Sequence, residues 1–240
     1  MVDTRQSGDF QRDTAGRENF FDECRRVWYD PHLRYRRTLI TLGTIAIALG
    51  VGLRFYCPSA LWLDEALSVN IAKLPLIQIP TALSHDGAPP LYYVLLHFWM
   101  IPFGRSDLSV RALSGVLSVV ALPFFWHAGR RVGGRITGWA VFFLAVTSPF
   151  AIQYAATARM YSLMILLSLL GFLALEHVLE EPTRRHRIEL GVVTAAILYT
   201  HYWGVYLVAV AGAWLLFRIC KHRLPTPSTP CAVMMPTYLS

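Results

Sequence analysis

LWLDEALSVNIAKLPLIQIPTALSHDGAPPLYY, residues 61–93, is an acidic segment in a chain otherwise dominated by long apolar runs. It holds the adjacent acids Asp64 and Glu65 and a third acid, Asp86, with Trp62 near one end and two tyrosines at the other. Aromatic residues of this kind favour a membrane–water interface, because their rings are apolar while their N–H or O–H groups want water. We therefore expect the segment to lie along a membrane surface, where its carboxylates can meet both a lipid headgroup and a water-borne reactant.

The composition is typical of an integral membrane protein. Of the 240 residues, 55% are hydrophobic and only 15% are charged, which is little polar surface for a globular protein. The formal net charge of +7 does not indicate a nucleic-acid partner, because the basic residues lie in an N-terminal tail and in short clusters between apolar runs. The expected partner is a lipid bilayer, and no nucleic acid is expected.

Six apolar runs approach the ~20 residues that a spanning helix needs, the last two being short. They are residues 38–56, 108–128, 136–152, 160–179, 188–201 and 203–218. A further run, residues 90–103, is shorter than the roughly 17 residues required, so we expect it to be interfacial or re-entrant. If it does not cross, most of the 22 Lys and Arg residues fall on one side, whereas they divide evenly if it does. The positive-inside rule favours the first arrangement.

The sequence thus predicts an all-α polytopic protein of the plasma (inner) membrane with about six transmembrane helices and interfacial helices in its first outer loop. Residues 1–37 form a basic tail that we place in the cytoplasm, and residues 38–223 form the transmembrane module with outer loop 57–107. Residues 224–240 are rich in Pro, Ser and Thr, which fits a loose tail or an abrupt truncation.

This topology brings three segments to the outer face: residues 57–107, 153–159 and 200–204. They can converge on one site. Asp64 and Glu65 are neighbours and so point about 100° apart on a helix, which lets one acid face a cleft while the other faces elsewhere. An apolar stripe at helical spacing predicts an amphipathic helix lying flat on the bilayer. On this pattern alone, the two acids could equally be the solvated face of that helix.

Other polar residues leave alternatives open. Asp86 lies in a turn-forming segment and fits a turn cap as well as a ligand. Arg159, next to Tyr161, fits either a snorkelling interfacial arginine or a cation that binds phosphate through its guanidinium fork. His201 and the other histidines lack close ligand spacing, and the four cysteines show no CxxC pair, so a divalent metal finds no support in the sequence.

Five motifs occur in a characteristic order along residues 38–218: LWLDEALS, HDGAPPLYYVLLHFW, SDLSVRALSGVLSVV, GRRVGGR and SPFAIQYAATARMYSL. In this succession the chain resembles the N-terminal module of GT-C-fold glycosyltransferases, which include protein O-mannosyltransferases and the aminoarabinose transferases that modify lipid A. Members of that family are usually much longer, with further spans and often a soluble C-terminal domain.

The resemblance implies an inverting transfer of a sugar from a polyprenyl-phosphate carrier to a hydroxyl of a lipid, glycan or protein acceptor on the outer face. By that resemblance Asp64 matches the general base and Glu65 its neighbour in the motif. Asp86 matches a second acidic position of the loop, and Arg159 a position near the donor phosphate. We add Tyr161 and His201 as substrate-binding candidates. The sequence identifies no certain cofactor and leaves a divalent metal open, though without support.

The physical chemistry of the residues agrees with those roles. A sugar hydroxyl becomes a good nucleophile when a positioned carboxylate accepts its proton, and a lipid phosphate leaves more readily when a cation stabilises its charge. No sugar-nucleotide motif is present. The alternatives are a non-catalytic membrane binding or transport protein and an inactive truncated remnant.

Overall fold

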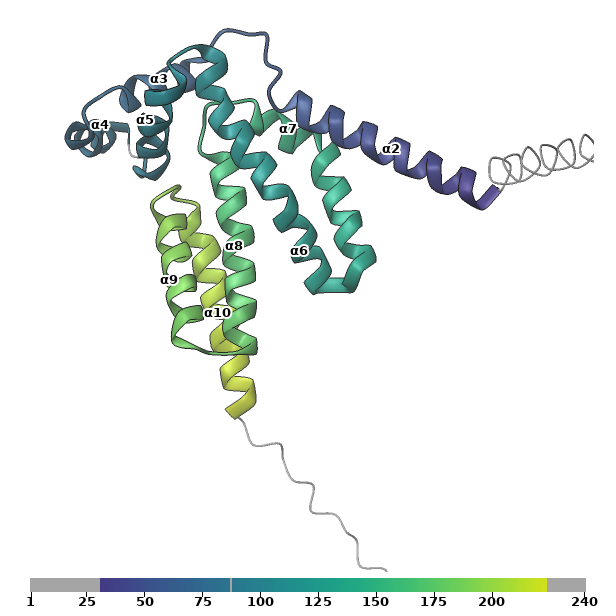
Figure 1. Cartoon of the computed structure of the whole chain (residues 1–240). Helices are drawn as coiled ribbons and strands as arrows, with labels where there is room; N and C mark the ends of the chain where they lie inside the picture. The colour runs from purple at the N-terminus through teal and green to yellow at the C-terminus, as the bar shows by residue number, and fades with distance from the viewer. Residues whose placement is uncertain (1–30, 87, 224–240) are drawn as a thin grey trace, which may run out of the picture.

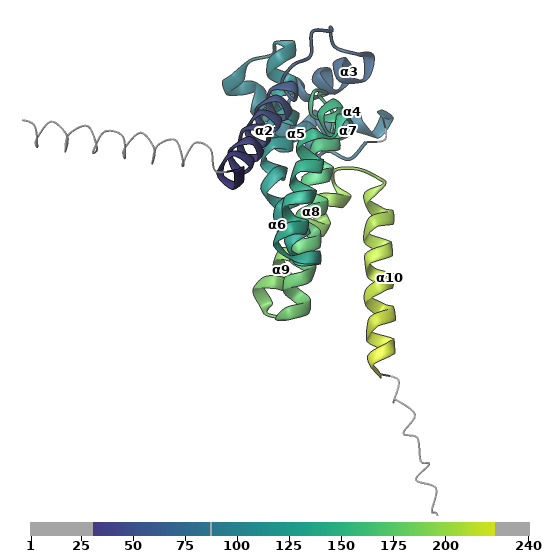
Figure 2. The same ribbon diagram turned by 90° about the vertical axis from the view of Figure 1, so that its right-hand side faces the viewer.

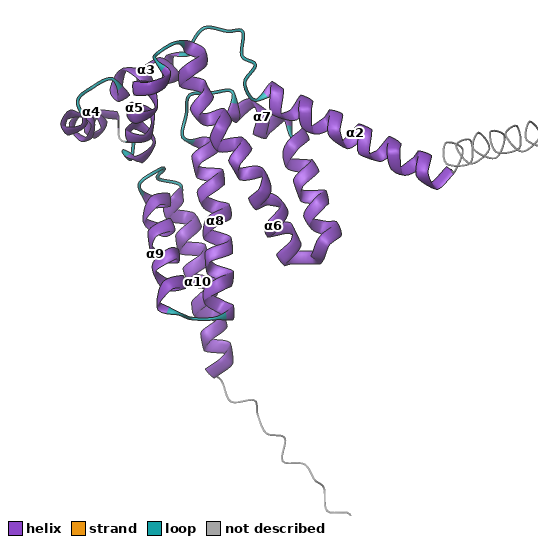
Figure 3. Cartoon of the chain, viewed as in Figure 1, coloured by secondary structure: helices purple, strands orange, loops and turns teal. Residues whose placement is uncertain are grey.

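The computed structural model describes residues 31–86 and 88–223, and these residues form helices joined by short turns, without strands (Figures 1 and 3). The helices are α2 (Pro31–Leu53), α3 (Leu63–Ala72), the 3₁₀ turn η1 (Leu76–Gln78), α4 (Ile79–Asp86), α5 (Leu91–Phe103), α6 (Asp107–Thr147), α7 (Pro149–Ala155), α8 (Tyr161–Glu180), α9 (Arg184–Leu198) and α10 (Gly204–Arg223). Residues 1–30 and 224–240 lie outside the described residues, and with them most of the predicted N-terminal tail and all of the C-terminal one.

Within residues 31–86 and 88–223, three helical segments are long and apolar enough to cross a membrane: Tyr35–Leu53, Asp107–Thr147 and Tyr161–Glu180. The segments Leu91–Phe103 and Gly204–Cys220 are apolar but shorter. The all-helical class expected from the sequence is therefore confirmed for the described residues, and the three apolar helices agree with association with a membrane. The six predicted crossings stay a prediction.

Helix α6 is a hairpin rather than a single rod. Its backbone leaves helical geometry at Gly133 and at Gly134, where φ is 81°, a conformation that glycine adopts without a steric penalty. The two arms pack closely, since a Cβ added to Gly129 would lie 3.0 Å from the Cα of Gly138. The second arm consequently runs back beside the first (Figure 1). The break falls inside the GRRVGGR connector between the second and third predicted spans.

Arg54, just beyond α2, fastens that helix to the α6 hairpin. Its side chain is 1% exposed and donates to the carbonyl groups of Gly50, Ala145 and Val146 and to the hydroxyl of Ser118. The last carbonyl groups of a helix have no intrahelical partner and carry partial negative charge, which a guanidinium satisfies. Arg54 therefore caps the second arm of α6, while most of α2 stays exposed and apolar.

The short helices α3, α4 and α5 gather at the end of the molecule where α6 begins, and α8, α9 and α10 extend away from it (Figures 1 and 2). His97 of α5 is hydrogen-bonded through Nδ1 to the carbonyl group of Ala72 at 2.8 Å, and the Trp99 indole N–H donates to the Ser109 carbonyl at 2.9 Å. The Leu91 N–H donates to the Tyr199 carbonyl at 2.9 Å. This last bond joins the first loop to the turn between α9 and α10.

Candidate functional site

A polar cavity of about 230 Å³, here called the rim cavity, opens where three distant segments meet. The segments are α3 with the start of α5, the loop between α7 and α8, and the turn between α9 and α10. Its lining residues are Asp64, Leu67, Ala88, Pro89, Tyr93, Arg159, Met160, His201 and Tyr202. The three segments expected to converge therefore do so, and Asp64, Arg159 and His201 share one cavity.

Asp64 lies in the first turn of α3 with 72% of its side chain exposed. Its Oδ2 is 3.9 Å from Nη1 of Arg159, which also donates to the Asp64 carbonyl group at 3.4 Å. Both contacts are long, so the carboxylate keeps oxygen lone pairs free for another partner. An acid in the first turn also suits the positive end of the helix dipole.

Glu65, the adjacent acid, is 2% exposed and points into the protein. Its Oε1 accepts from Arg111 Nε at 3.0 Å and from the Ala158 N–H at 2.8 Å, and its Oε2 accepts from Arg111 Nη2 at 2.6 Å and from the Trp62 N–H at 3.0 Å. Burial raises the pKa of this carboxyl, but the Arg111 hydrogen bonds and charge and the two backbone N–H groups outweigh it, so the pKa lies below its usual value.

Glu65 is not part of the cavity lining. The prediction that it binds substrate has no support in this geometry, because protein groups already occupy both of its oxygen atoms. Arg111 is equally engaged, since it also donates to the carbonyl groups of Ser59 at 2.7 Å and Ala60 at 3.0 Å. Sequence reasoning missed this role of Arg111. The available signal was its position in the apolar helix after Ser106, where a charge needs a partner.

The backbone that carries Arg159 is held from both sides. The Ala158 N–H donates to Glu65, and the Arg159 carbonyl accepts from the Ser114 hydroxyl at 3.1 Å. Ser114 is itself 3.0 Å from the hydroxyl of the fully buried Tyr92. We call Glu65, Arg111, Ser114 and the backbone of Ala158 and Arg159 the buried clamp. It fixes the origin of the Arg159 side chain while leaving its guanidinium at the cavity.

The Tyr161 ring and His201 lie near that guanidinium. Arg159 Cζ is 5.9 Å from the Tyr161 ring centroid, and the Tyr161 and His201 rings are 6.2 Å apart. His201 Nδ1 accepts from the Trp203 N–H at 3.1 Å, so in the neutral ring Nε2 carries the proton. Burial, and then the Arg159 charge, lower the pKa of His201, which favours this neutral form. Arg159 and His201 are therefore N–H donors suited to an anion.

Asp86 is the last residue of α4, and its side chain lies outside the described residues, so its predicted role stays a prediction. Among the described side chains, no three His, Cys, Asp or Glu residues gather closely enough to hold a metal ion.

Comparison with protein-family models, with curated proteins and with solved structures finds no match for this chain.

Proposed function

We propose that the chain is a membrane glycosyltransferase of the GT-C type, which moves a sugar from a polyprenyl-phosphate carrier to a hydroxyl of a lipid, glycan or protein acceptor. One observation carries the proposal. The exposed carboxylate of Asp64 and the guanidinium of Arg159, 95 residues apart in the chain, meet in one cavity at the end of a set of apolar helices.

In the proposed reaction the acceptor hydroxyl loses its proton to the Asp64 carboxylate while its oxygen bonds to the anomeric carbon of the sugar. The bond from that carbon to the phosphate oxygen breaks, and the carrier leaves as a lipid phosphate. Arg159 stabilises the negative charge that this phosphate gains, and the His201 N–H adds a second donor. A single displacement inverts the anomeric centre and needs no covalent sugar–enzyme intermediate.

The proposed topology has six crossings, with both ends of the chain in the cytoplasm and the rim cavity on the outer face of the plasma membrane. The two arms of α6 and helices α2, α8, α9 and α10 would supply the crossings. Exposed arginines at the opposite end of the molecule support this orientation, because cytoplasmic loops of membrane proteins are rich in Lys and Arg. These arginines are Arg130, Arg131, Arg135, Arg184, Arg185 and Arg187.

The chemistry is tested with the chain reconstituted in vesicles that contain a series of polyprenyl-phosphate sugars and candidate acceptors. We expect Asp64→Asn to reduce transfer by at least about 100-fold, as loss of a general base typically does. Asp107→Asn is the matched control, since Asp107 is an exposed acid in the first turn of α6 that does not line the cavity. Equal, nonzero transfer by the parent and Asp64→Asn would remove Asp64 from the mechanism.

Labelling tests the topology. Single cysteines placed at positions 64, 159 and 201 in a background without the natural cysteines should react with an impermeant maleimide from the outer face only. A cysteine at position 132, beside the α6 break, should react only after the membrane is permeabilised. Reaction of position 159 from the cytoplasmic side alone would exclude cooperation with Asp64 on the outer face.

A further inference from the structure

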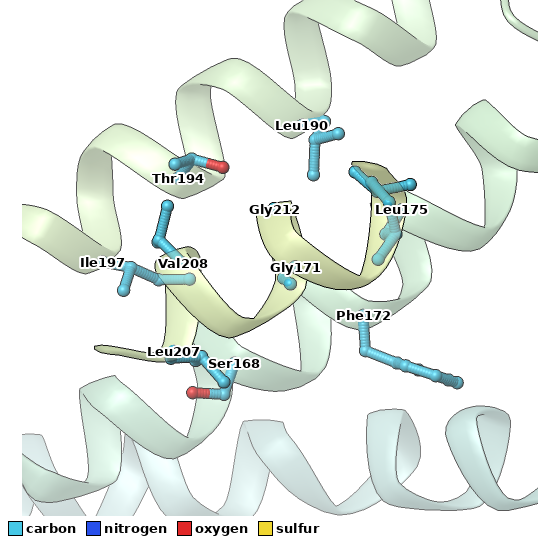
Figure 4. Close-up of a pocket in the computed structure, with 12 residues that line it drawn as sticks. Ser168, Gly171, Phe172, Leu175, Leu190, Thr194, Ile197, Leu207, Val208 and Gly212 are labelled. Atoms are coloured by element: carbon cyan, nitrogen blue, oxygen red, sulfur yellow. The ribbon is translucent and has the colours of Figure 1, made fainter. Parts of the chain in front are cut away.

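Exposed arginines gather at the end of the molecule away from the rim cavity, where α6 breaks and where α8 turns into α9 (Figures 1 and 2). An ion pair between Arg131 and Glu180 joins these two turns. We call residues 127–137 and 180–189 together the basic end. The apolar cavity of about 280 Å³ between α8, α9 and α10 is a separate feature, because no charged side chain lines it (Figure 4).

Most of the positive charge at the basic end is not neutralised by the protein. The two segments contain six arginines, all exposed, against three glutamates. Among the described residues only Arg131 and Arg185 form ion pairs, with glutamates of α8 and α9. The other four arginines have no ion pair there; they are Arg130, Arg135, Arg184 and Arg187. The basic end therefore keeps a charge that an anion from outside the protein can offset.

The arginines of α9 are not placed where they would stabilise their own helix. Arg184 and Arg187 lie in its first turn, which contains no acid. The partial charge at a helix N-terminus is positive, so cations there are unfavourable for the isolated helix. An external anion would remove this repulsion.

Exposed apolar side chains lie among the arginines of the α6 break. The side chain of Val132 is 74% exposed and that of Ile136 is 86% exposed. Trp126, whose ring lies 5.3 Å from Arg130 Cζ, and Trp139 also meet here, with their ring centroids 5.9 Å apart. A segment at a membrane surface buries such side chains at the edge of the acyl chains while its arginines reach the phosphates. This mixture favours a lipid surface over a free anion.

The α6 break holds its two unpaired arginines in a fixed turn. The Thr137 hydroxyl donates to the Gly133 carbonyl at 2.8 Å, and a Cβ added to Gly133 would lie 2.4 Å from that hydroxyl oxygen. Arg130 is on the first arm of this turn and Arg135 is on the second. An anion bound here would not have to order the backbone, which lowers the entropic cost of binding.

We propose that the basic end binds the headgroups of anionic phospholipids in the leaflet that meets it. The four unpaired arginines contact the phosphates, whose oxygens match the guanidinium fork, and the exposed Val132 and Ile136 lie among the acyl chains. Sugar transfer is proposed for the other end of the molecule, so this inference does not depend on it.

The test measures which phospholipid the purified full chain retains. Native mass spectrometry counts dioleoyl phosphatidylglycerol and dioleoyl phosphatidylcholine bound from a detergent solution that contains equal amounts of both. One basic residue near an anionic surface is worth about fivefold in affinity, so Arg130→Gln/Arg135→Gln should lower the preference for phosphatidylglycerol by about tenfold or more. Lys73→Gln/Arg105→Gln is the matched control, because it removes two exposed cations outside the basic end.

Arg184→Gln/Arg187→Gln gives an independent measurement from the α9 side and serves if the α6 variant does not fold. We expect it to lower the preference in the same direction, and added salt should weaken the preference of the parent, because exposed charges are screened. Equal binding of the two lipids by the parent would overturn the proposal. So would a preference that falls no further in the basic-end variants than in the control.

A competition arm identifies the source of the phosphate. Inorganic phosphate at the concentration of the lipids should leave phosphatidylglycerol bound, because it has no acyl chain to place beside Val132 and Ile136. Displacement by inorganic phosphate would overturn the assignment to a lipid surface. Sugar transfer is not read in this test, so its failure would leave the proposed glycosyltransferase standing.

Discussion

The rim cavity and the buried clamp are built from neighbouring residues, but the charged pair at the rim is loosely held and the charged pair in the clamp is buried and fully hydrogen-bonded. At the rim, Asp64 and Arg159 make long contacts and Asp64 remains largely exposed. In the clamp, Glu65 and Arg111 are buried, and four hydrogen bonds reach the Glu65 carboxylate. A buried ion pair must be fully hydrogen-bonded to offset its desolvation, whereas a loosely held pair can exchange its partner for a ligand. The clamp therefore fixes the position of the Arg159 backbone, whereas the side chains of Asp64 and Arg159 at the rim stay free to interact with a ligand.

Removing one partner of the clamp should have the largest effect. Glu65→Ala or Arg111→Ala leaves an uncompensated charge with the other side chain 5% or less exposed, and we expect a loss of about 3–5 kcal/mol in unfolding free energy. Denaturant unfolding in detergent measures this loss. Asp107→Ala is the control, and a loss below about 1 kcal/mol in either clamp variant would show that the pair does not hold the fold together.

Lowering the pH should reduce the unfolding free energy of the parent by part of the loss expected for the clamp variants. The folded-state pKa of Glu65 lies below its unfolded value, so its contribution is complete above about pH 4.5 and is lost as pH falls through the folded pKa. The melting temperature of the parent should therefore drop more steeply below pH 4.5 than that of Glu65→Gln, which has no carboxyl to protonate. Parallel pH profiles for the two proteins would contradict this assignment.

Ser114→Ala should have a smaller effect, about 1–3 kcal/mol, because it removes the bonds to the Arg159 carbonyl and to the buried Tyr92 hydroxyl. The matched control is Ser109→Ala on the same helix, since Ser109 is only partly buried and the hydrogen bond from its hydroxyl to the Gly104 carbonyl is exposed. Thermal unfolding of both variants checks the difference. An equal response would mean that the Arg159 backbone does not depend on Ser114.

Asp64→Ala should change stability least, by no more than about 0.5 kcal/mol, because its side chain is exposed and its contact with Arg159 is long. Under the proposed function, the same substitution should reduce sugar transfer by at least about 100-fold. Loss of activity with an unchanged melting temperature would separate the rim from the clamp, whereas a large loss of stability would show that Asp64 belongs to the structural part.

The helices themselves were readable from sequence because they depend on local pattern. The GRRVGGR connector marked the α6 break, and apolar run lengths marked α2 and α8. Which acid turns inward was not readable, because both are in the first turn of α3. The answer depends on Arg111, 46 residues away, and on the Ala158 N–H, 93 residues away. The apolar stripe also concealed a second face of α3, formed by Glu65, Ser68, Val69 and Ala72, which is the face that packs inward.

The contacts of Arg54 bear on how the chain is assembled during synthesis. Two of its carbonyl partners, in residues 145 and 146, leave the ribosome only after 91 and 92 further residues have been added. Until then the Gly50 carbonyl of its own helix and, later, the Ser118 hydroxyl are the only two of its four partners that have been synthesised. The contacts between Arg54 and the second arm of α6 can therefore form only after both arms of the hairpin have been synthesised, which places the docking of α2 late in the assembly of the chain.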